Sequence, residues 1–269
     1  MLSTIHLIAG LNMALCTDKS LTYLNGLGYN VVRLPRKGID PLDVLGREGR
    51  SIERLGRLDQ LWTSKKTFPT IGVPQPSAHI NGQQTSEMSA SIGLKLLSGV
   101  LKAIGANVPE VSFAYNNAKS LQFTFGNVTT RSVAPLEIGK FLSEGDIHSA
   151  NPFVEHYFHD DDTDVFVITE VLESDQITVS AKAEAGGQIS ADIPAIQSAV
   201  GANVSVSAKG GTSSDLTYSG KDSVTFGFKA FAIAFDERWR IAGAAPSAAL
   251  AFEAGTDPIM LGRSTLLVR

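Results

Sequence analysis

The richest group of potential metal ligands in the sequence begins with Glu155, His156 and His159 and continues into the acidic run 160–164. In a zinc protease helix the Glu follows the first His, whereas here it precedes it, so the spacing does not match. The acidic run also lacks the glycine and the terminal Glu of a calcium-binding loop. We therefore predict that this segment is a solvated turn leading into a strand at Val165, and we predict no metal site.

Nucleophilic catalysis has no motif to support it. The sequence contains neither the G-x-S-x-G turn of serine hydrolases nor a glycine-rich phosphate loop ending in G-K-S/T. Cys16 is the only cysteine, which excludes an internal disulfide framework. Pairing it with any of five His residues says almost nothing about a thiol dyad. We predict no catalytic residues, and the protein is not expected to be an enzyme.

Cys16 is better suited to carrying a lipid. The segment Met1–Leu15 before it has no Lys, Arg, Asp or Glu. A start at Met13 would make the cysteine the fourth residue of a short apolar leader, Met-Ala-Leu-Cys. A secreted lipoprotein would instead need a basic start and a small residue where the chain has Leu15. Both interpretations predict a lipidated Cys16, and a buried free thiol is the remaining alternative.

Basic residues are concentrated between Val31 and Lys66, although the chain of 269 residues has a formal net charge of −4. That negative balance excludes nucleic-acid binding driven by bulk charge. Within the stretch, nine basic residues stand against five acidic ones, a local net of +4. The nine are Arg33, Arg36, Lys37, Arg47, Arg50, Arg54, Arg57, Lys65 and Lys66. They form either a solvated face with many ion pairs or a contact surface for anionic lipid.

The secondary structure predicted from the sequence consists mainly of β-strands. Apolar and polar residues alternate without exception from Ile177 to Ala185, the pattern of a strand with two unlike faces. The pattern returns at 203–209 and 224–228, while Val165–Leu172 is apolar enough for a buried central strand. Val111–Tyr115 and Leu121–Phe125 fit a hairpin around Asn116-Asn117.

Two helices are predicted, and both are weak. Ser89–Gly105 has a helical apolar stripe, but Gly93 and Gly99 inside it each cost about 1 kcal/mol of helix stability. A shorter helix fits Pro194–Val200, between the two clearest alternating strands, with Gly201 just beyond its end. No apolar run reaches the roughly 18 residues of a membrane-spanning helix.

Several runs of residues resemble the bacterial gasdermins. They are Gly28–Arg36 (GYNVVRLPR), Pro41-Leu42, Arg54-Leu55-Gly56, 201–206 (GANVSV) and 224–228 (VTFGF). The resemblance covers nearly the whole chain from about Met13. It implies a single α+β domain like the membrane-attack half of animal gasdermins, with a twisted, largely antiparallel sheet, peripheral helices and a short C-terminal inhibitory peptide. It also implies a pore-forming protein of bacterial antiphage defence with a palmitoylated cysteine near its start, for which Cys16 is the candidate.

The alternating strands are suited to a membrane pore. A membrane-spanning strand needs about 9–11 residues that alternate between lipid-facing apolar and lumen-facing polar side chains. The residues predicted to face lipid are Ile177, Val179, Ala181, Ala183, Val204, Val206 and Ala208. We hypothesise that these strands lengthen into one membrane hairpin as the helix Pro194–Val200 unfolds. The helix Ser89–Gly105, ahead of the hairpin 111–125, would supply a second.

The C-terminal segment fits a removable inhibitor. Residues 243–251 are small and rich in Ala, Pro and Ser, which favours proteolysis, and the expected cleavage region includes Gly243, Pro246 and Leu250. Beyond it, the apolar pieces 259–261 and 266–268 could dock on the body, each large side chain contributing about 1.5–3 kcal/mol. The expected organisation is a leader over 1–12 that is not native, a pore-forming domain over 13–242, and a linker with an autoinhibitory peptide over 243–269.

We therefore expect a cytoplasmic monomer that is activated when a partner protease, caspase-like or similar, removes the peptide. It would then assemble on anionic lipids of the inner membrane into a closed β-barrel ring and kill the cell, because open strand edges are too costly in lipid. No cofactor is expected apart from palmitate on Cys16, and no nucleic acid. The alternative is an exported surface lipoprotein that acts as a binding module, processed immediately before Cys16.

Overall fold

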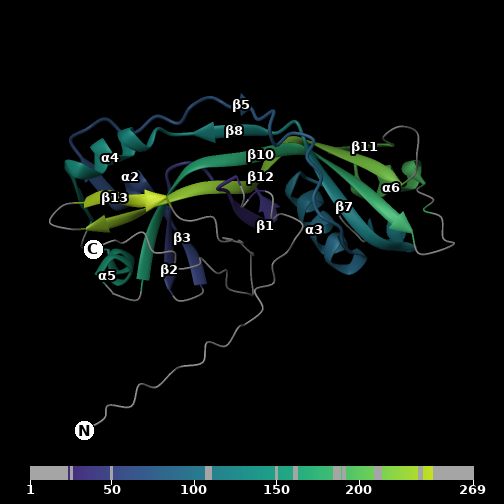
Figure 1. Ribbon diagram of the computed structural model, residues 1–269, viewed down its shortest axis with the longest axis horizontal. Helices are drawn as coiled ribbons and strands as arrows, with labels where there is room; N and C mark the ends of the chain where they lie inside the picture. The colour runs from purple at the N-terminus through teal and green to yellow at the C-terminus, as the bar shows by residue number, and fades with distance from the viewer. Residues whose placement is uncertain are drawn as a thin grey trace, which may run out of the picture.

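Two long antiparallel strands organise the computed structural model of the chain (Figure 1). β10 (Thr163–Ala183) and β12 (Asp215–Phe235) have 21 residues each and pair from Val165–Ile233 to Ser180–Asp215. At about 3.3 Å per residue, each strand is about 70 Å long. The structure describes residues 24, 27–48, 51–106, 111–148, 151–159, 163–183, 189, 192–208, 214–235 and 239–244.

The other elements are short. The strands are β1 (Asn30–Arg36), β2 (Asp43–Glu48), β3 (Ser51–Arg57), β4 (Trp62–Ser64), β5 (Gln75–Pro76), β6 (Met88–Ser89), β7 (Ala118–Gly126), β8 (Thr129–Ser132), β9 (Gly145–Ile147), β11 (Val204–Ala208) and β13 (Trp239–Ala244). The helices are α2 (Leu58–Leu61), α3 (Ala90–Ala103), α4 (Pro135–Ser143), α5 (Pro152–His159), α6 (Ile193–Val200) and the 3₁₀ helix η2 (Val111–Tyr115).

The long strands connect two ends of one antiparallel sheet. Among the described residues, eleven strands join this sheet, and β4 pairs separately with β9. At the body end, β10 pairs with β2 and β12 pairs with β1 and β13. At the other end the order is β7, β10, β12, β11. We call this second region, with residues 174–183 of β10 and 215–220 of β12, the extended end; Figure 1 shows it with α3 and α6 beside it.

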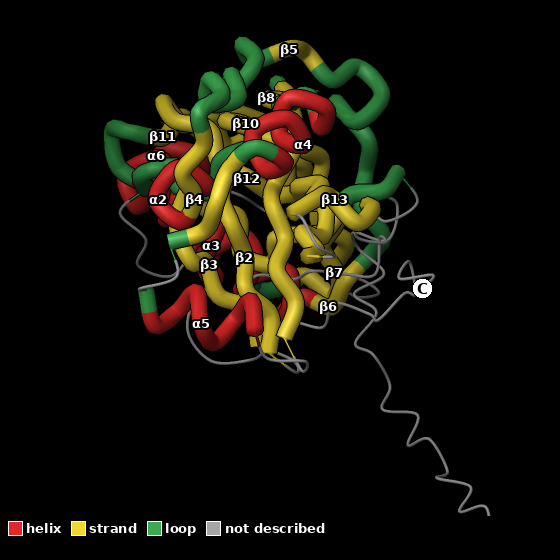
Figure 2. The backbone as a smooth tube through the Cα atoms, turned by 90° about the vertical axis from the view of Figure 1, so that its left-hand side faces the viewer, coloured by secondary structure: helices red, strands yellow, loops and turns green. Residues whose placement is uncertain are grey.

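Alternation along the strands sorts the apolar side chains into three clusters. The first lies at the extended end and includes side chains of α3 and α6. The second lies on one face of the body end, where Val165 and Val167 meet side chains of α2, α4 and α5; Figure 2 looks onto this end. The third lies on the opposite face and consists of Val32, Ile39, Leu45, Phe166, Ile168, Val171, Phe228 and Ala230.

The third cluster differs from the other two in what covers it. No helix in the described ranges contributes a side chain to it, yet its members are at most 6% exposed. We call this side of the body end the helix-free face.

The predicted fold class is confirmed, as are most of the predicted elements. The strands expected at 165–172 and from Ile177 are parts of β10, the one at 203–209 is β11, and the one at 224–228 lies inside β12. The two predicted helices are α3 and α6, each within a few residues of the expected ends.

Two local predictions are wrong. Val111–Tyr115 forms η2 instead of the first strand of a hairpin, and β7 pairs with β10 and β6. A five-residue, mostly apolar segment fits a strand and a helical turn equally well, and here Ala114 and Tyr115 turn into the first cluster. Residues 155–159 of the segment expected as a solvated turn belong to helix α5, because Val154 and Tyr157, three residues apart, bury one helical face in the second cluster. Residues 160–162 of that segment lie outside the described residues, and the strand expected after it is β10.

Candidate functional site

The apolar face of the extended end gathers residues that were predicted to face lipid. Four of the seven are buried in the first cluster, namely Ile177, Val179, Ala181 and Val204. Val206 packs against that cluster and is half-buried, as are Ala183 and Ala208. The register places Ile177 between Phe125 of β7 and Tyr218 of β12, so neighbouring strands continue the apolar surface.

The opposite face of the same four strands is polar and uncharged over most of its area. Most of its side chains are hydroxyls and amides, from Ser120, Gln122, Thr124, Gln176, Thr178, Ser180, Ser205, Ser207, Thr217 and Ser219. Asp215, opposite Ser180, also lies on this face. Oγ1 of Thr178 lies 2.8 Å from Oγ1 of Thr217, and Nε2 of Gln176 donates to Oγ of Ser219 at 3.0 Å. Lys182 forms an ion pair with Glu87. The extended end is therefore amphipathic across four strands.

Helix α3 lies close against the apolar face because glycines face the contact. A Cβ placed on Gly93 would lie 2.8 Å from Cδ1 of Leu121, and one on Gly220 would lie 2.6 Å from Cβ of Ile104. Both distances are too short for carbon atoms, so a larger residue would push α3 away from the sheet. Gly93 weakens the helix by itself, as the sequence predicted, and it also permits this contact.

A buried pair of tyrosines ties η2 to β12. The hydroxyls of Tyr115 and Tyr218 are 2.9 Å apart, and both side chains are at most 2% exposed. Burial raises the pKa of Tyr218 to about 12, although the hydrogen bond with Tyr115 acts in the other direction. Burial also raises the pKa of Tyr115, followed by the charge interaction with Tyr218. Both rings are therefore neutral hydrogen-bonding groups at physiological pH.

Helix α6 is fixed at both ends and connects directly to β11. Asp192 caps its first turn by accepting from the N–H of Ala195 at 3.1 Å, and Gly201 ends it with φ of 83°, a value that favours glycine. The chain then turns back as β11. This return places the Gln197 side chain beside β11, where it bonds to the backbone of Val204 and Val206.

The basic stretch predicted to contact lipid is largely ion-paired where its side chains are described. Five pairs involve it: Lys37 with Asp222, Arg47 with Asp164, Arg54 with Asp43, Arg57 with Asp59, and Lys66 with Glu144. Burial lowers the pKa of Arg36, and the neighbouring charge of Arg54 lowers it further. Lys65 is exposed. The ion-paired alternative thus describes most of this stretch, and its lipid contact stays a prediction.

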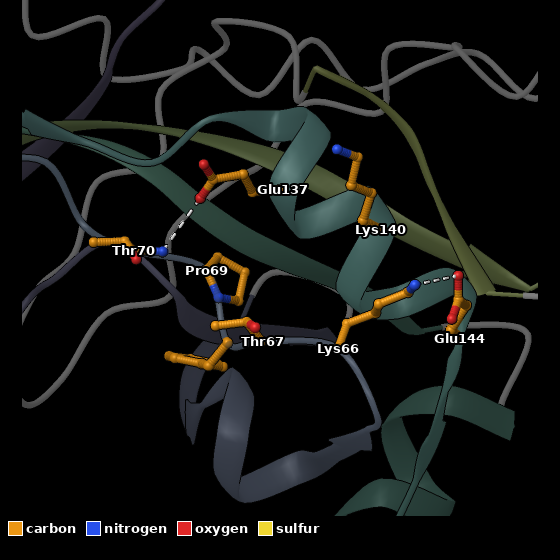
Figure 3. Close-up of a pocket in the computed structure, with 8 residues that line it drawn as sticks. Lys66, Thr67, Pro69, Thr70, Glu137, Lys140 and Glu144 are labelled. Atoms are coloured by element: carbon orange, nitrogen blue, oxygen red, sulfur yellow. Dashed lines mark hydrogen bonds and ion pairs between the residues drawn. The ribbon is translucent and has the colours of Figure 1, made fainter.

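One of these pairs lines a surface pocket between α4 and the segment 66–70 (Figure 3). Lys66 Nζ lies 3.1 Å from Glu144, and the N–H of Thr70 donates to Glu137 at 3.2 Å. Lys140 also lines the pocket. The two glutamates thus offset the positive charge of the lysines here.

The remaining predicted site residues fall mostly outside the described ranges. Cys16, Arg50, Pro246 and Leu250 lie there, and of Arg33 the structure describes the backbone, in β1. Gly243 lies in β13, opposite Ala232 of β12. The predicted lipid attachment, the cleavage region and the domain boundaries stay predictions.

Gln197, Tyr115 and Tyr218 were not predicted as site residues from the sequence. A signal for Gln197 was present: it is the one amide in a short helix whose apolar residues Ile196 and Val200 are spaced to face the core. The tyrosine pair joins positions 103 residues apart in the chain, and a contact at that separation leaves no local pattern.

None of the helices in the described ranges is long and apolar enough to cross a membrane. Residues 32–240 match the sequence model of the Bacterial Gasdermin Family. A gasdermin from Vitiosangium sp. is 42% identical over 222 residues, which cover 82% of this chain and 83% of the relative. One from a Desulfuromonadales bacterium is 35% identical over 224 residues, with the same shares covered. The structure of a bacterial gasdermin from Bradyrhizobium tropiciagri has a similar fold, with a TM-score of 0.62 at 14% identity, covering 84% of this chain and 91% of that chain.

Proposed function

The chain belongs to the bacterial gasdermin family, and from that premise we propose that it is a pore-forming protein of bacterial antiphage defence with no catalysis of its own. The observation that carries the proposal is the two-faced extended end. Four neighbouring strands have an apolar face that packs against α3 and α6 and a mostly uncharged polar face opposite. Transmembrane β-strands need this division between lipid and lumen. The exported surface lipoprotein gains no support from these relatives.

The inserting hairpin is best formed from the two long strands. β10 and β12 are already paired up to Ser180–Asp215, and the connection between them contains α6 and β11. The two strands predicted from the sequence to form one hairpin, at 177–185 and 203–209, correspond to β10 and β11, and β12 lies between them. We therefore propose that α6 opens and the connection 184–214 extends both long strands. The segment from α3 through η2 would extend ahead of β7 as the second hairpin.

The C-terminal peptide is the proposed restraint. We assign its apolar pieces, 259–261 and 266–268, to the helix-free face, which is apolar and buried without a described helix. Because Gly243 belongs to β13, we expect the partner protease to cut after Ala244. Removal of the peptide would expose the helix-free face and release the sheet for assembly of many copies at the inner membrane.

Membrane contact is proposed to begin with lipid on Cys16. An acyl chain supplies about 0.8 kcal/mol per buried CH₂ and gives marginal binding by itself, so a second attraction is needed. Lys65, which is exposed, would provide this second attraction to anionic headgroups. Basic side chains that exchange their carboxylate partners for headgroups would add to it. The cytoplasmic monomer would thus become a membrane-bound assembly after cleavage.

Dye release from liposomes of bacterial lipid tests the proposal. A chain that ends near Pro246 is compared with the full-length protein, and both are checked for folding by circular dichroism. We expect leakage from the shortened chain alone. Silence from a folded shortened chain would contradict pore formation, and equal leakage from both would contradict autoinhibition by the peptide. Cys16→Ala in the shortened chain then separates the lipid's contribution, with reduced leakage expected.

A further inference from the structure

A buried asparagine lies on the helix-free face without a hydrogen-bond partner. Asn30 of β1 is directly opposite Phe228 of β12, and Val32, two residues further along β1, belongs to the third cluster. Opposite residues of an antiparallel pair project to the same side of a sheet, so the carboxamide lies among the apolar side chains of this face. Asn30 is 0% exposed, and within the described part of the chain neither its Oδ1 nor its Nδ2 is hydrogen-bonded.

A carboxamide in this position needs a partner. Buried polar atoms nearly always have one, because an unsatisfied group keeps the full cost of leaving water. The register places Arg131 and Thr225 on the same face, and both are already bonded. Arg131 donates to Glu173 at 2.7 Å and to Asp40 at 2.5 Å. Thr225 donates to a backbone carbonyl oxygen at 3.1 Å. The segment that covers this face is therefore the natural source of a partner for Asn30.

The two unbonded atoms of Asn30 suit a peptide backbone. Oδ1 accepts a hydrogen bond and Nδ2 donates one, and a residue in an extended chain offers its N–H and its C=O on the same side. A fatty acyl chain, such as the one proposed for Cys16, offers no hydrogen-bonding group. The chemistry of the carboxamide thus selects a peptide segment as its partner.

The C-terminal peptide can reach Asn30. The strand β13 ends at Ala244, opposite Phe231 of β12, which is about 10 Å along that strand from the residue facing Asn30. The apolar piece 259–261 starts 15 residues after Ala244, and 15 extended residues span about 50 Å. The chain that precedes β1 arrives from the opposite face, because Leu24 is buried in the first cluster. Position and length therefore both favour the C-terminal peptide.

We propose that Asn30 anchors the C-terminal peptide by binding the backbone of one extended residue within 259–268. This inference rests on the proposed function, which assigns the peptide to the helix-free face, and it adds the group that fixes the peptide's position there. Apolar contacts tolerate a shift along a surface, whereas a buried asparagine specifies one register. The peptide is thus held by two hydrogen bonds in addition to its apolar side chains.

Hydrogen exchange in the full-length, uncut chain tests the anchor itself. Asn30→Leu and Asn30→Ala both remove the acceptor for an N–H of the peptide. One amide within 259–268 should therefore exchange about fivefold faster or more, the factor of one net hydrogen bond. Asn117→Leu, at an exposed position between η2 and β7, is the matched control and should leave exchange in the peptide unchanged.

Two results of this experiment would overturn the anchor. One is unchanged exchange within 259–268 in both Asn30 variants. The other is faster exchange confined to residues 1–23, which would make the N-terminal segment the partner of the carboxamide.

Release of the cut peptide tests the consequence. A specific protease site is inserted after Pro246, a fluorophore is attached at the C-terminus, and the fall in fluorescence anisotropy after cutting gives the rate at which the peptide leaves. Both Asn30 variants should release it about tenfold faster or more, because two hydrogen bonds of about fivefold each are lost. Asn117→Leu should match the wild type. Equal rates in all four proteins would contradict anchoring by Asn30.

The anchor and the proposed pore fail separately, because neither measurement needs a membrane. A wild-type chain that leaks no dye from liposomes after cutting overturns the proposed function, while exchange and peptide release still decide whether Asn30 holds the peptide. A chain that leaks after cutting, together with unchanged exchange and release in both Asn30 variants, overturns the anchor alone. Asn30→Leu keeps the branched shape of the side chain and Asn30→Ala adds no volume, so a folding defect in one variant leaves the other to decide.

Discussion

At the scale of single residues, the extended end is fastened by a few buried polar contacts within an apolar cluster. The hydroxyl pair of Tyr115 and Tyr218 is the clearest, because it joins η2, the next described helix after α3, to the long strand β12. Removing one hydroxyl leaves the other buried without its partner, which costs about 1–3 kcal/mol. A residue pair can thus hold the α3 region to the sheet.

This pair predicts that stability falls at alkaline pH. The folded state raises the pKa of Tyr218 from about 10 to about 12. The contribution of the protonated Tyr218 hydroxyl to the free energy of unfolding is complete below pH 10. It is lost as the pH rises through 12, by about 1.4 kcal/mol for each unit by which folding shifts the pKa. Urea titrations should show the free energy of unfolding falling between pH 10 and 12.

Phenylalanine variants check the assignment. Tyr218→Phe should lose about 1–2 kcal/mol at neutral pH and flatten the alkaline decline. The double variant Tyr115→Phe/Tyr218→Phe should lose less than the sum of the two single variants, because it leaves no orphaned hydroxyl. An unchanged alkaline decline in Tyr218→Phe would assign the pH dependence to other groups.

At the scale of elements, the proposed insertion requires the helices on the apolar face to move while the strands keep their pairing. Gly105, just after α3, and Asn203, just before β11, come together there: a Cβ on Gly105 would lie 3.7 Å from Cβ of Asn203. That separation suits a disulfide, whose Cβ atoms are about 3.8 Å apart. The contact joins the two helical segments that are proposed to open.

A reversible cross-link at this contact predicts a switchable pore. The variant Gly105→Cys/Asn203→Cys, cut at an inserted protease site, should release no dye when oxidised and should recover when a reductant is added. The reduced form is its own control, because the backbone strain at residue 105, where φ is 98°, is present in both states. Full leakage in the oxidised form would contradict the opening of these segments.

The sequence predicts where helices and strands lie better than it predicts which strands pair with one another. Strict alternation after Ile177 identified one face of β10, and flanking capping residues identified α6, because both signals are local. That β12 lies between β10 and β11 is a matter of tertiary pairing, which alternation does not encode. The strand expected at Val111–Tyr115 failed for a related reason, since packing of Tyr115 against Tyr218 decided its conformation. Gln197 was missed because its role depends on the return of β11.

At the scale of the whole molecule, the proposed restraint and the proposed insertion involve different ends of the same two strands. Phe166 and Ile168 of β10 belong to the helix-free face at the body end, whereas Ile177 and Val179 belong to the extended end. A peptide docked at one end can therefore restrain the other through continuous strands. Its binding needs only a few apolar side chains, each worth about 1.5–3 kcal/mol.

Substitutions in the tail predict activation without a protease. Leu261→Asp/Leu267→Asp in the full-length chain places charges where apolar burial is proposed, so the uncut protein should release dye from liposomes. Ser264→Asp is the control for added charge and should stay silent. A silent double variant that still leaks when shortened near Pro246 would show that these leucines do not provide the restraint.

The polar face of the extended end also has an electrical consequence. Its hydroxyls and amides carry no net charge, and Lys182 is neutralised by Glu87, whereas Asp215, opposite Ser180, adds a carboxylate to this face. Selectivity between ions of opposite sign comes from rings of charged groups, and one such carboxylate in every copy would form a ring. In planar bilayers under a salt gradient, the activated protein should therefore give a reversal potential displaced toward cation preference. Asp215→Asn, which removes the carboxylate from every copy, should move that potential toward zero, and an unmoved potential would mean that this face does not line the conducting path.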